Sequence, residues 1–83
     1  MQIDNLKKGT RVKMAIGWEA VLVDNKKGTI RFAEVYGDFT ETGSIYCHDI
    51  VAYRDANGNW QRDVEYSQSQ QKCKKMNAAL FGE

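Results

Sequence analysis

Two runs of β-branched and aromatic residues, separated by a turn sequence, most constrain how this chain can fold. Trp18-Glu-Ala-Val-Leu-Val-Asp24 and Thr29-Ile-Arg-Phe-Ala-Glu-Val-Tyr36 suit the pleated, half-buried surface of a β-sheet. Between them, Asn25-Lys26-Lys27-Gly28 combines a residue that favours the start of a type I turn with a glycine that can take a left-handed conformation. Residues 18–36 therefore predict a β-hairpin around which the rest of the chain is arranged.

The turn also predicts a register for this hairpin. A three-residue loop sets Leu22 opposite Phe32, whereas a four-residue loop sets Glu19 opposite Glu34, a like-charge pair that destabilises a sheet. We therefore expect the three-residue loop. One face then carries Trp18, Ala20, Leu22, Ile30, Phe32 and Tyr36, and the other carries Val21, Val23, Ala33 and Val35. Neither face is polar throughout, so we expect each to be partly covered, as in a tightly curled barrel with an added helix.

Shorter segments on either side of the hairpin predict further strands. Residues 11–15 alternate polar and apolar, which predicts a first strand with Val12 and Met14 inward. Residues 37–44 are bounded by glycines and show no periodicity, so we expect an exposed loop with Phe39 in its middle. Residues 45–54 predict a fourth strand and residues 59–66 a fifth. The turn between them ends at Asn57-Gly58, and either a two-residue turn or a three-residue turn with Gly58 last fits it.

The last part of the chain predicts a helix over about residues 68–81. Ser67 and Gln70 match a capping box, no glycine or proline follows until Gly82, and Gly82 is placed to end the helix. A narrow apolar stripe recurs at helical spacing and is expected to dock on the sheet; it consists of Cys73, Met76 and Leu80.

These elements predict one domain over residues 1–83, mainly β with one C-terminal helix: a five-stranded antiparallel SH3-like barrel with strands over about residues 11–66. Three glycine-led strings carry a resemblance: Gly9-Thr10-Arg11-Val12, Gly28-Thr29-Ile30-Arg31, and Gly43-Ser44-Ile45-Tyr46 with His48-Asp49-Ile50. Over most of residues 6–66 the chain resembles small SH3-like or KOW-type barrel proteins of unassigned role carried on phages, plasmids and integron cassettes of bacteria. The resemblance rests on structural positions and implies no catalytic residue.

Composition narrows the setting in which the chain works. Hydrophobic residues make up 42% and aromatics 11%, as in ordinary globular domains, and the longest apolar runs are too short to span a membrane. The N-terminus lacks the regions of a signal peptide. We expect Cys47 and Cys73 to be reduced thiols in a cytoplasmic protein, although a single bridge between them stays open.

Cys47-His48-Asp49 is the one string whose residue types build nucleophilic and metal sites. On a strand, adjacent side chains point to opposite faces, so Cys47 and His48 are not expected to touch. Metal-binding spacing such as C-x-x-C and phosphate-binding glycine-rich loops do not occur in the sequence. We therefore expect a protein that is not an enzyme, with no catalytic residue, no metal and no cofactor.

Two binding hypotheses remain. The formal net charge is only +1, so both depend on how the charged residues are distributed along the chain rather than on their sum. The favoured one is a protein-binding module, an inhibitor of a host factor or a homodimer, that uses an acidic loop with aromatics; its candidate residues are Asp38, Phe39, Glu41, Trp18 and Tyr36. The alternative is a nucleic-acid-binding barrel that uses the basic first third of the chain with its aromatics; its candidates are Lys7, Lys8, Arg11, Lys13, Lys26, Lys27 and Arg31.

Overall fold

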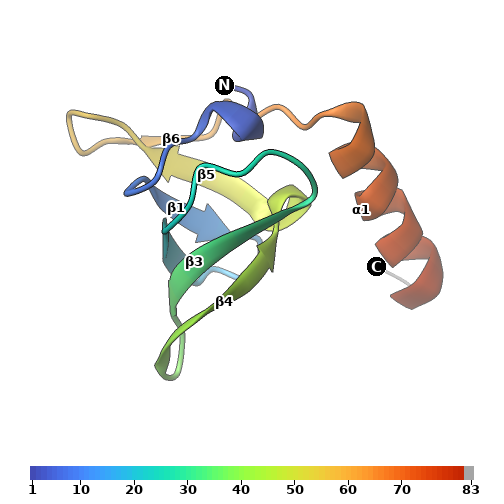
Figure 1. The fold of residues 1–83 in the computed structure, drawn as a ribbon, viewed down its shortest axis with the longest axis horizontal. Coiled ribbons are helices and arrows are strands. Elements are labelled where there is room, and N and C mark those ends of the chain that lie inside the picture. Colours follow the sequence, from blue (N-terminus) through green and yellow to red (C-terminus); the bar gives the residue numbers. More distant parts are fainter. Residues whose placement is uncertain (82–83) are drawn as a thin grey trace.

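The computed structural model describes residues 1–81, and side chains through Asn77. One antiparallel sheet of six strands, in the order β4-β3-β2-β1-β5-β6, curls around the core, and a helix follows it (Figure 1). The elements are η1 (Ile3–Asn5), β1 (Arg11–Met14), β2 (Glu19–Leu22), β3 (Ile30–Tyr36), β4 (Thr40–Tyr46), η2 (Cys47–Asp49), β5 (Ile50–Arg54), β6 (Trp60–Gln61) and α1 (Gln68–Phe81), where η marks a 3-10 helix. A mainly-β chain with one C-terminal helix is confirmed. The expected five-stranded barrel differs, because this sheet has six strands and is open, with β4 and β6 at its edges.

The core fills the concave side of the sheet. Val12 and Met14 of β1 are buried, as the alternation of residues 11–15 predicts. Each strand from β1 to β5 contributes apolar side chains to the same cluster, and the N-terminal segment adds two more; the buried members are Ile3, Leu6, Val12, Met14, Ala20, Leu22, Ala33, Ile45, Cys47, Ile50 and Tyr53. The N-terminal segment therefore belongs to the fold rather than only leading into it.

The central hairpin forms, but its predicted register is wrong by one residue. Leu22 lies opposite Ala33 rather than Phe32. Because a shift of one residue turns every side chain to the other face, Phe32 and Ile30 point outward, 39% and 44% exposed, although both were expected on the same face as Ala20 and Leu22. Arg31 takes an inward position and is completely buried.

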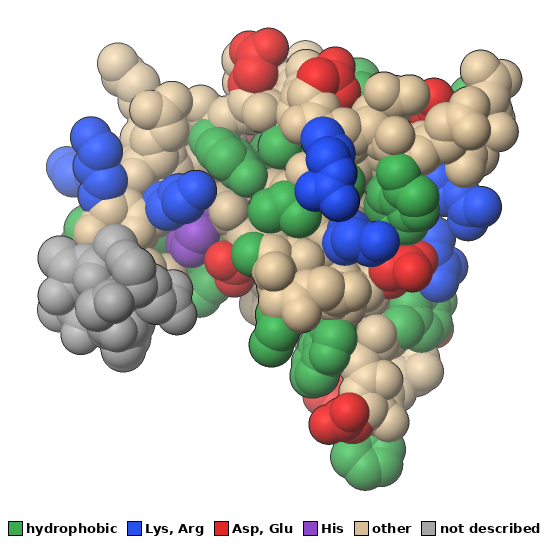
Figure 2. Space-filling view, turned by 180° about the vertical axis from the view of Figure 1, so that it is seen from behind, with side chains coloured by type: hydrophobic (Ala, Val, Ile, Leu, Met, Phe, Trp, Pro, Cys, Tyr) green, Lys and Arg blue, Asp and Glu red, His purple; other side chains and the backbone are tan. Residues whose placement is uncertain are grey.

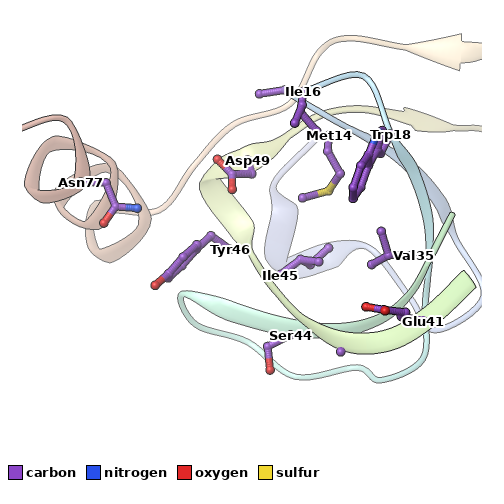
Figure 3. A pocket seen from close by; sticks show the side chains of 12 residues that line it. Met14, Ile16, Trp18, Val35, Glu41, Ser44, Ile45, Tyr46, Asp49 and Asn77 are labelled. Carbon is purple, nitrogen blue, oxygen red and sulfur yellow. The ribbon is translucent and has the colours of Figure 1, made fainter. Parts of the chain in front are cut away.

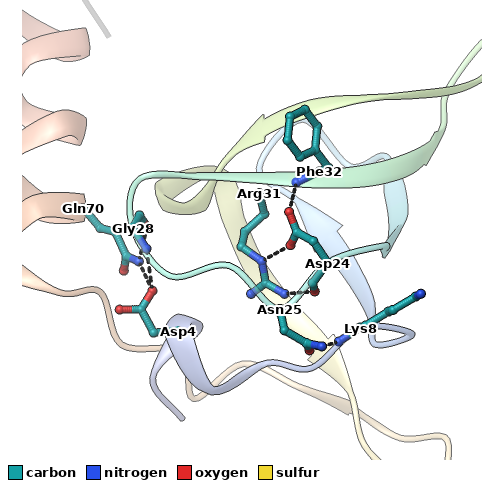
Figure 4. Close-up of polar contacts among 8 residues, drawn as sticks. All are labelled: Asp4, Lys8, Asp24, Asn25, Gly28, Arg31, Phe32 and Gln70. Atoms are coloured by element: carbon teal, nitrogen blue, oxygen red, sulfur yellow. Dashed lines mark hydrogen bonds and ion pairs between the residues drawn. The ribbon is translucent and has the colours of Figure 1, made fainter.

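A buried ion pair explains this register. Asp24 accepts hydrogen bonds from Nε of Arg31 at 2.6 Å and from the backbone N–H of Phe32 at 2.9 Å, and Arg31 Nη2 donates to the Asp24 carbonyl at 2.5 Å (Figure 4). These bonds set residues 24 and 31 opposite each other and lengthen the connection between β2 and β3 beyond three residues. Gly28 takes the positive φ expected of it, 132°. The turn residues favour a three-residue loop, but the buried guanidinium group of Arg31 requires a charged partner, and this requirement sets the register instead.

The predicted loop over residues 37–44 is wrong as well. Gly37, Asp38 and Phe39 alone make the turn, and β4 begins at Thr40 and pairs with β3 without a break as far as Tyr46. Strand β4 lies at the edge of the sheet and is mostly exposed, so it needs little apolar alternation to form. This explains why the sequence pattern did not predict it.

Residues 45–54 do not form one strand. Cys47–Asp49 winds into the 3-10 helix η2, which redirects the chain so that β5 pairs with β1 instead of continuing β4. The prediction that Cys47 and His48 lie on opposite faces of a strand is therefore wrong.

The predicted fifth strand over residues 59–66 shrinks to Trp60–Gln61. The turn before it is the three-residue alternative: the N–H of Asp55 donates to the Asn59 carbonyl at 2.9 Å, and Gly58 is last with φ of 82°. Beyond β6 the chain leaves the sheet, and only Glu65 returns to an isolated parallel bridge with Gln2.

The capping box at the start of α1 is confirmed. The N–H of Ser67 donates to the Gln70 side chain at 2.8 Å, and the N–H of Gln70 donates to Ser67 Oγ at 3.2 Å. The same buried Gln70 amide also donates to Asp4 Oδ1 at 2.9 Å and to the Gly28 carbonyl at 2.8 Å (Figure 4). The helix is thus anchored at its first turn by polar bonds.

Docking of α1 on the sheet by an apolar stripe was expected, but the side chains described through Asn77 do not show it. Met76 is 55% exposed, and the helix packs beside η2 at one side of the sheet (Figure 1). The side chain of Leu80 and the residue Gly82, which complete the predicted stripe and helix end, lie outside the described residues.

We expect Asp24→Asn to destabilise the fold by about 3 kcal/mol, because it leaves the Arg31 charge buried without its counter-ion. Burial acts to raise the pKa of Asp24, but the bonds from Arg31 and Phe32 outweigh it and hold the pKa below its usual value. A carboxylate with a lowered folded pKa stabilises the fold above its unfolded pKa, and this contribution is lost as the pH falls through the folded value. The wild type should therefore lose stability more steeply than Asp24→Asn on acidification below about pH 4.

Urea unfolding followed by circular dichroism at several pH values measures both effects. Asp38→Asn removes an exposed carboxylate at the β3–β4 turn and serves as the matched control, with an expected change within about 0.5 kcal/mol. Equal stabilities for the two variants at neutral pH would contradict the role given to this ion pair.

Candidate functional site

An open groove lies between the β1–β2 turn and β4. Its volume is about 800 Å³. Figure 3 shows Met14, Trp18, Val35 and Ile45 pointing into it from β1, from the start of β2 and from strands β3 and β4. Ala15, Ile16 and Tyr46 complete its apolar lining. The lining is thus mainly apolar, and it comes from segments that are far apart in the sequence.

The groove exists because the sheet is open and because β4 presents little bulk on its concave side. Glu41, Gly43 and Ile45 alternate along that side of β4. Only Ile45 is buried among them, and a Cβ placed on Gly43 would find no atom within 4 Å. A hollow therefore remains where a larger residue would complete the core.

A second, smaller hollow of about 120 Å³ shares Trp18, Val35 and Glu41 with the groove and extends it to the β3–β4 turn. There it is lined by Asp38 and Phe39, and Phe39 is 77% exposed. Figure 2 shows this hairpin projecting from the body of the molecule with hydrophobic and acidic side chains near its tip. We call the two hollows together the β4 groove.

All charged residues that line the β4 groove are acidic: Asp38, Glu41 and Asp49. Carboxylates at the rim of an apolar hollow give it a negative potential, which favours ligands that carry positive charge beside apolar groups. The groove is thus suited to one sign of ligand charge, although the whole chain is nearly neutral.

The structure brings together most of the residues predicted for protein binding. Trp18, Asp38, Phe39 and Glu41 all line the smaller hollow. The Trp18 ring lies against Gly37, where an added Cβ would come within 2.5 Å of it. Tyr36 lies elsewhere, on the outer face, where its hydroxyl donates to Glu34 at 3.1 Å.

The residues predicted for nucleic-acid binding do not form one basic surface. Arg31 is buried in its ion pair, and Arg11 is paired with Glu19 at 2.6 Å. Three of the cations lie over aromatic rings: Arg11 over Tyr36 at 4.9 Å, Lys13 over Trp60 at 4.9 Å and Lys26 over Phe32 at 4.6 Å. Lys7, Lys8 and Lys27 are exposed in connecting segments. Figure 2 shows basic side chains lying directly beside hydrophobic ones in the middle of the face that it presents.

Cys47 and His48 lie in the 3-10 helix η2 rather than on a strand, but they do not form a nucleophilic site. Cys47 is completely buried, and burial raises the pKa of its thiol to about 11. His48 is also buried; its Nε2 lies 3.1 Å from the Asn77 amide and 3.6 Å from Asp49, and its ring stacks on Tyr46. A thiol that stays protonated at neutral pH is a poor nucleophile. That the chain is not an enzyme remains a prediction, and it now depends on this burial.

Cys47 and Cys73 are both free thiols, so the structure contains no bridge between them. Within residues 1–81, no group of three or more histidine, cysteine, aspartate or glutamate side chains is placed to hold a metal ion. None of the helices in the described part of the chain is both long and apolar enough to cross a membrane.

Apart from Trp18, sequence reasoning missed the groove residues outside the β3–β4 turn, chiefly Met14, Ile16, Tyr46 and Asp49. The spacing of Glu41, Gly43 and Ile45 is a signal for the hollow itself, because it is the period of a strand with a gap in the middle of one face. It does not indicate which residues other segments bring to that hollow. Treating residues 37–44 as a loop hid that signal.

The chain matches no protein-family model, no curated protein and no solved structure.

We expect the Cys47 thiol to react with a disulfide reagent at pH 8 only as fast as the protein opens, because it is buried and protonated. A Cys73→Ser variant isolates Cys47, and Cys47→Ser isolates the partly exposed Cys73 as the matched control. Absorbance of the released thiolate measures both rates, with Cys73 reacting faster. Rapid reaction of Cys47 in the folded protein would contradict the environment described here.

Proposed function

We propose that the chain is a small protein-binding module that holds a segment of its partner in the β4 groove. The observation that carries this proposal is an exposed apolar groove in which every charged lining residue is a carboxylate. Large apolar surfaces left open on small domains are characteristic of interaction sites. The partner segment then combines aliphatic or aromatic side chains with lysine or arginine.

The exposed aromatic residues support a role in binding. Trp18 is 42% exposed and Phe39 more so, at two points along the same groove. Tryptophan and other aromatic residues commonly supply most of the binding energy at interfaces, because they bury large areas with few rotatable bonds. The module thus has two aromatic anchor residues at the rim of the groove, and the space between them can take apolar side chains of the partner.

The wider setting is part of the proposal and rests on the resemblance. A small SH3-like barrel encoded on a mobile element acts as a non-catalytic inhibitor or adaptor of a host factor in the cytoplasm. The meander from β1 to β4, followed by η2 and the return of β5 to β1, supports an SH3-like arrangement to which β6 and α1 are additions. The two free thiols support a reducing compartment.

Replacing Trp18 by alanine should weaken binding of a groove ligand roughly tenfold or more, because an anchor at the rim is lost. Phe32→Ala is the matched control, since Phe32 is a similarly exposed aromatic on the outer face, and it should leave affinity nearly unchanged. Glu41→Lys should also weaken binding, by reversing the charge at the groove.

Ligands for this test come from a random peptide library displayed on phage and selected on the folded wild-type chain, and affinities are measured by fluorescence anisotropy. Selected peptides should combine apolar residues with lysine or arginine. Acidic selected peptides, or equal losses for Trp18→Ala and Phe32→Ala, would contradict the proposal. Thermal melts of each variant show that it remains folded.

A nucleic-acid-binding barrel is the second candidate, and the three cation–aromatic pairs on the outer face favour it. However, the rings of Tyr36, Trp60 and Phe32 are covered by those cations, and bases would have to displace them in order to stack. The buried Arg31 is not available to a phosphate.

We expect amide NMR spectra of the chain to stay unchanged when single-stranded RNA or DNA is added at low salt. Electrostatic binding is strongest under that condition, which makes it the most sensitive one. Shifts centred on Lys13, Lys26 and Phe32 that disappear at high salt would instead favour the second candidate.

A further inference from the structure

Among the residues that the structure describes, no strand pairs with the outer edge of β4. Its seven residues, Thr40–Tyr46, pair with β3 on one side in unbroken register, and β4 is the last strand of the sheet on the other side. The opposite edge strand, β6, has only two residues. The long free edge is therefore β4.

The backbone hydrogen bonds fix which groups of β4 face outward. In the same register, the N–H of Gly37 donates to the Phe39 carbonyl and the N–H of Cys47 donates to the Thr29 carbonyl. Since hydrogen-bonded and non-bonded pairs alternate in an antiparallel ladder, Glu41, Gly43 and Ile45 direct their N–H and C=O groups toward β3. The backbone groups of the residues between them point to the open edge; these are Thr40, Thr42, Ser44 and Tyr46, and all four are exposed.

This edge lacks the usual protection against strand addition. Natural edge strands carry lysine, proline or a bulge, or are very short. Strand β4 contains no lysine, arginine or proline, and its register with β3 shows no bulge. Its one charged side chain, Glu41, lines the groove.

The edge and the groove adjoin each other. A strand added to β4 lies about 4.8 Å from it, and every second side chain of that strand points to the concave side. Those side chains lie opposite Glu41, Gly43 and Ile45 and enter the β4 groove in the direction of Met14 and Trp18 (Figure 3). The one opposite Gly43 meets no side chain there and has the most room.

We propose that the partner segment binds as an additional antiparallel strand along β4, with apolar side chains opposite Gly43 and Ile45 and a lysine or arginine opposite Glu41. This inference rests on the proposed function and adds the conformation, the direction and the residue order of the ligand. Backbone hydrogen bonds to β4 supply affinity, and the groove selects the alternate side chains.

A second copy of the chain fits the same edge less well. Two β4 strands paired with each other bring the acidic groups of both copies, Asp38, Glu41 and Asp49, to one junction, and the residues that line the grooves supply no positive charge there. Like charges placed together across an interface oppose association. Charge therefore favours a basic segment of another protein.

The test uses a synthetic peptide probe, Thr-Leu-Thr-Phe-Thr-Arg-Thr, which carries a fluorophore and whose two ends are chemically blocked. Read from its N-terminus against Tyr46 back to Thr40, it places leucine, phenylalanine and arginine on the groove side. In this register the third and fifth residues of the probe are threonines that lie opposite Ser44 and Thr42, and their backbone N–H groups point at β4. Methylating those two amide nitrogens should weaken binding about tenfold or more, whereas methylating those of leucine and phenylalanine, which point away, should not.

Protein variants test the same geometry from the other side. Thr42→Pro removes an outward N–H and should lower affinity about tenfold, whereas Thr42→Val keeps the N–H and should bind as the wild type does. Gly43→Val fills the groove at a position with ordinary strand backbone and open space, so the fold should be kept while the probe is excluded.

The outcomes separate the two proposals. Loss of binding in Gly43→Val with no difference between the two methylated probes would overturn strand addition and leave the groove intact as a site. Binding that is unaffected by Gly43→Val and by Trp18→Ala would overturn both. Concentration-dependent dimers in sedimentation velocity that Thr42→Pro abolishes would show that a second copy, rather than a basic segment, occupies the edge.

Discussion

The buried ion pair between Arg31 and Asp24 determines how the central strands align, and the rest of the structure depends on that alignment. A guanidinium group without exposure to solvent requires a partner, and the backbone and side chain of Asp24 supply it together. With residues 24 and 31 opposite each other, Ala33 joins Leu22 in the core, and Phe32 turns outward. Every later position on β3 and β4 follows from this register, including the inward direction of Val35, Gly43 and Ile45.

The β4 groove is a consequence of the same geometry. Because the sheet stays open with β4 at one edge, the concave side of β4 is buried only at Ile45. Gly43 has no side chain to fill the hollow, and Glu41 places a carboxylate at a position where a closed core would hold an apolar side chain.

Side-chain hydrogen bonds connect the C-terminal helix to the rest of the fold. Gln70 joins its first turn to η1 and to the β2–β3 connection, and Asn77 meets His48 on η2. In the part of α1 whose side chains are described, through Asn77, polar groups rather than a broad apolar face thus hold the helix. This arrangement keeps the helix beside η2, and no described strand pairs with the outer edge of β4.

The sequence by itself determined the class of structure, because strand alternation, turn residues and the capping box act over a few neighbouring residues. It therefore predicted Val12 and Met14 in the core, the helix that follows Ser67, and a group of binding candidates that meets at Trp18, Asp38, Phe39 and Glu41. Tertiary structure decided the rest. The burial of Arg31 places the central register one residue away from the predicted one. Cys47–Asp49 forms a 3-10 helix, which lets β5 return to β1. Pairing with β3 makes Thr40–Tyr46 a strand, although its sequence is too polar to predict one. These outcomes depend on contacts between residues distant in sequence, which no local pattern records.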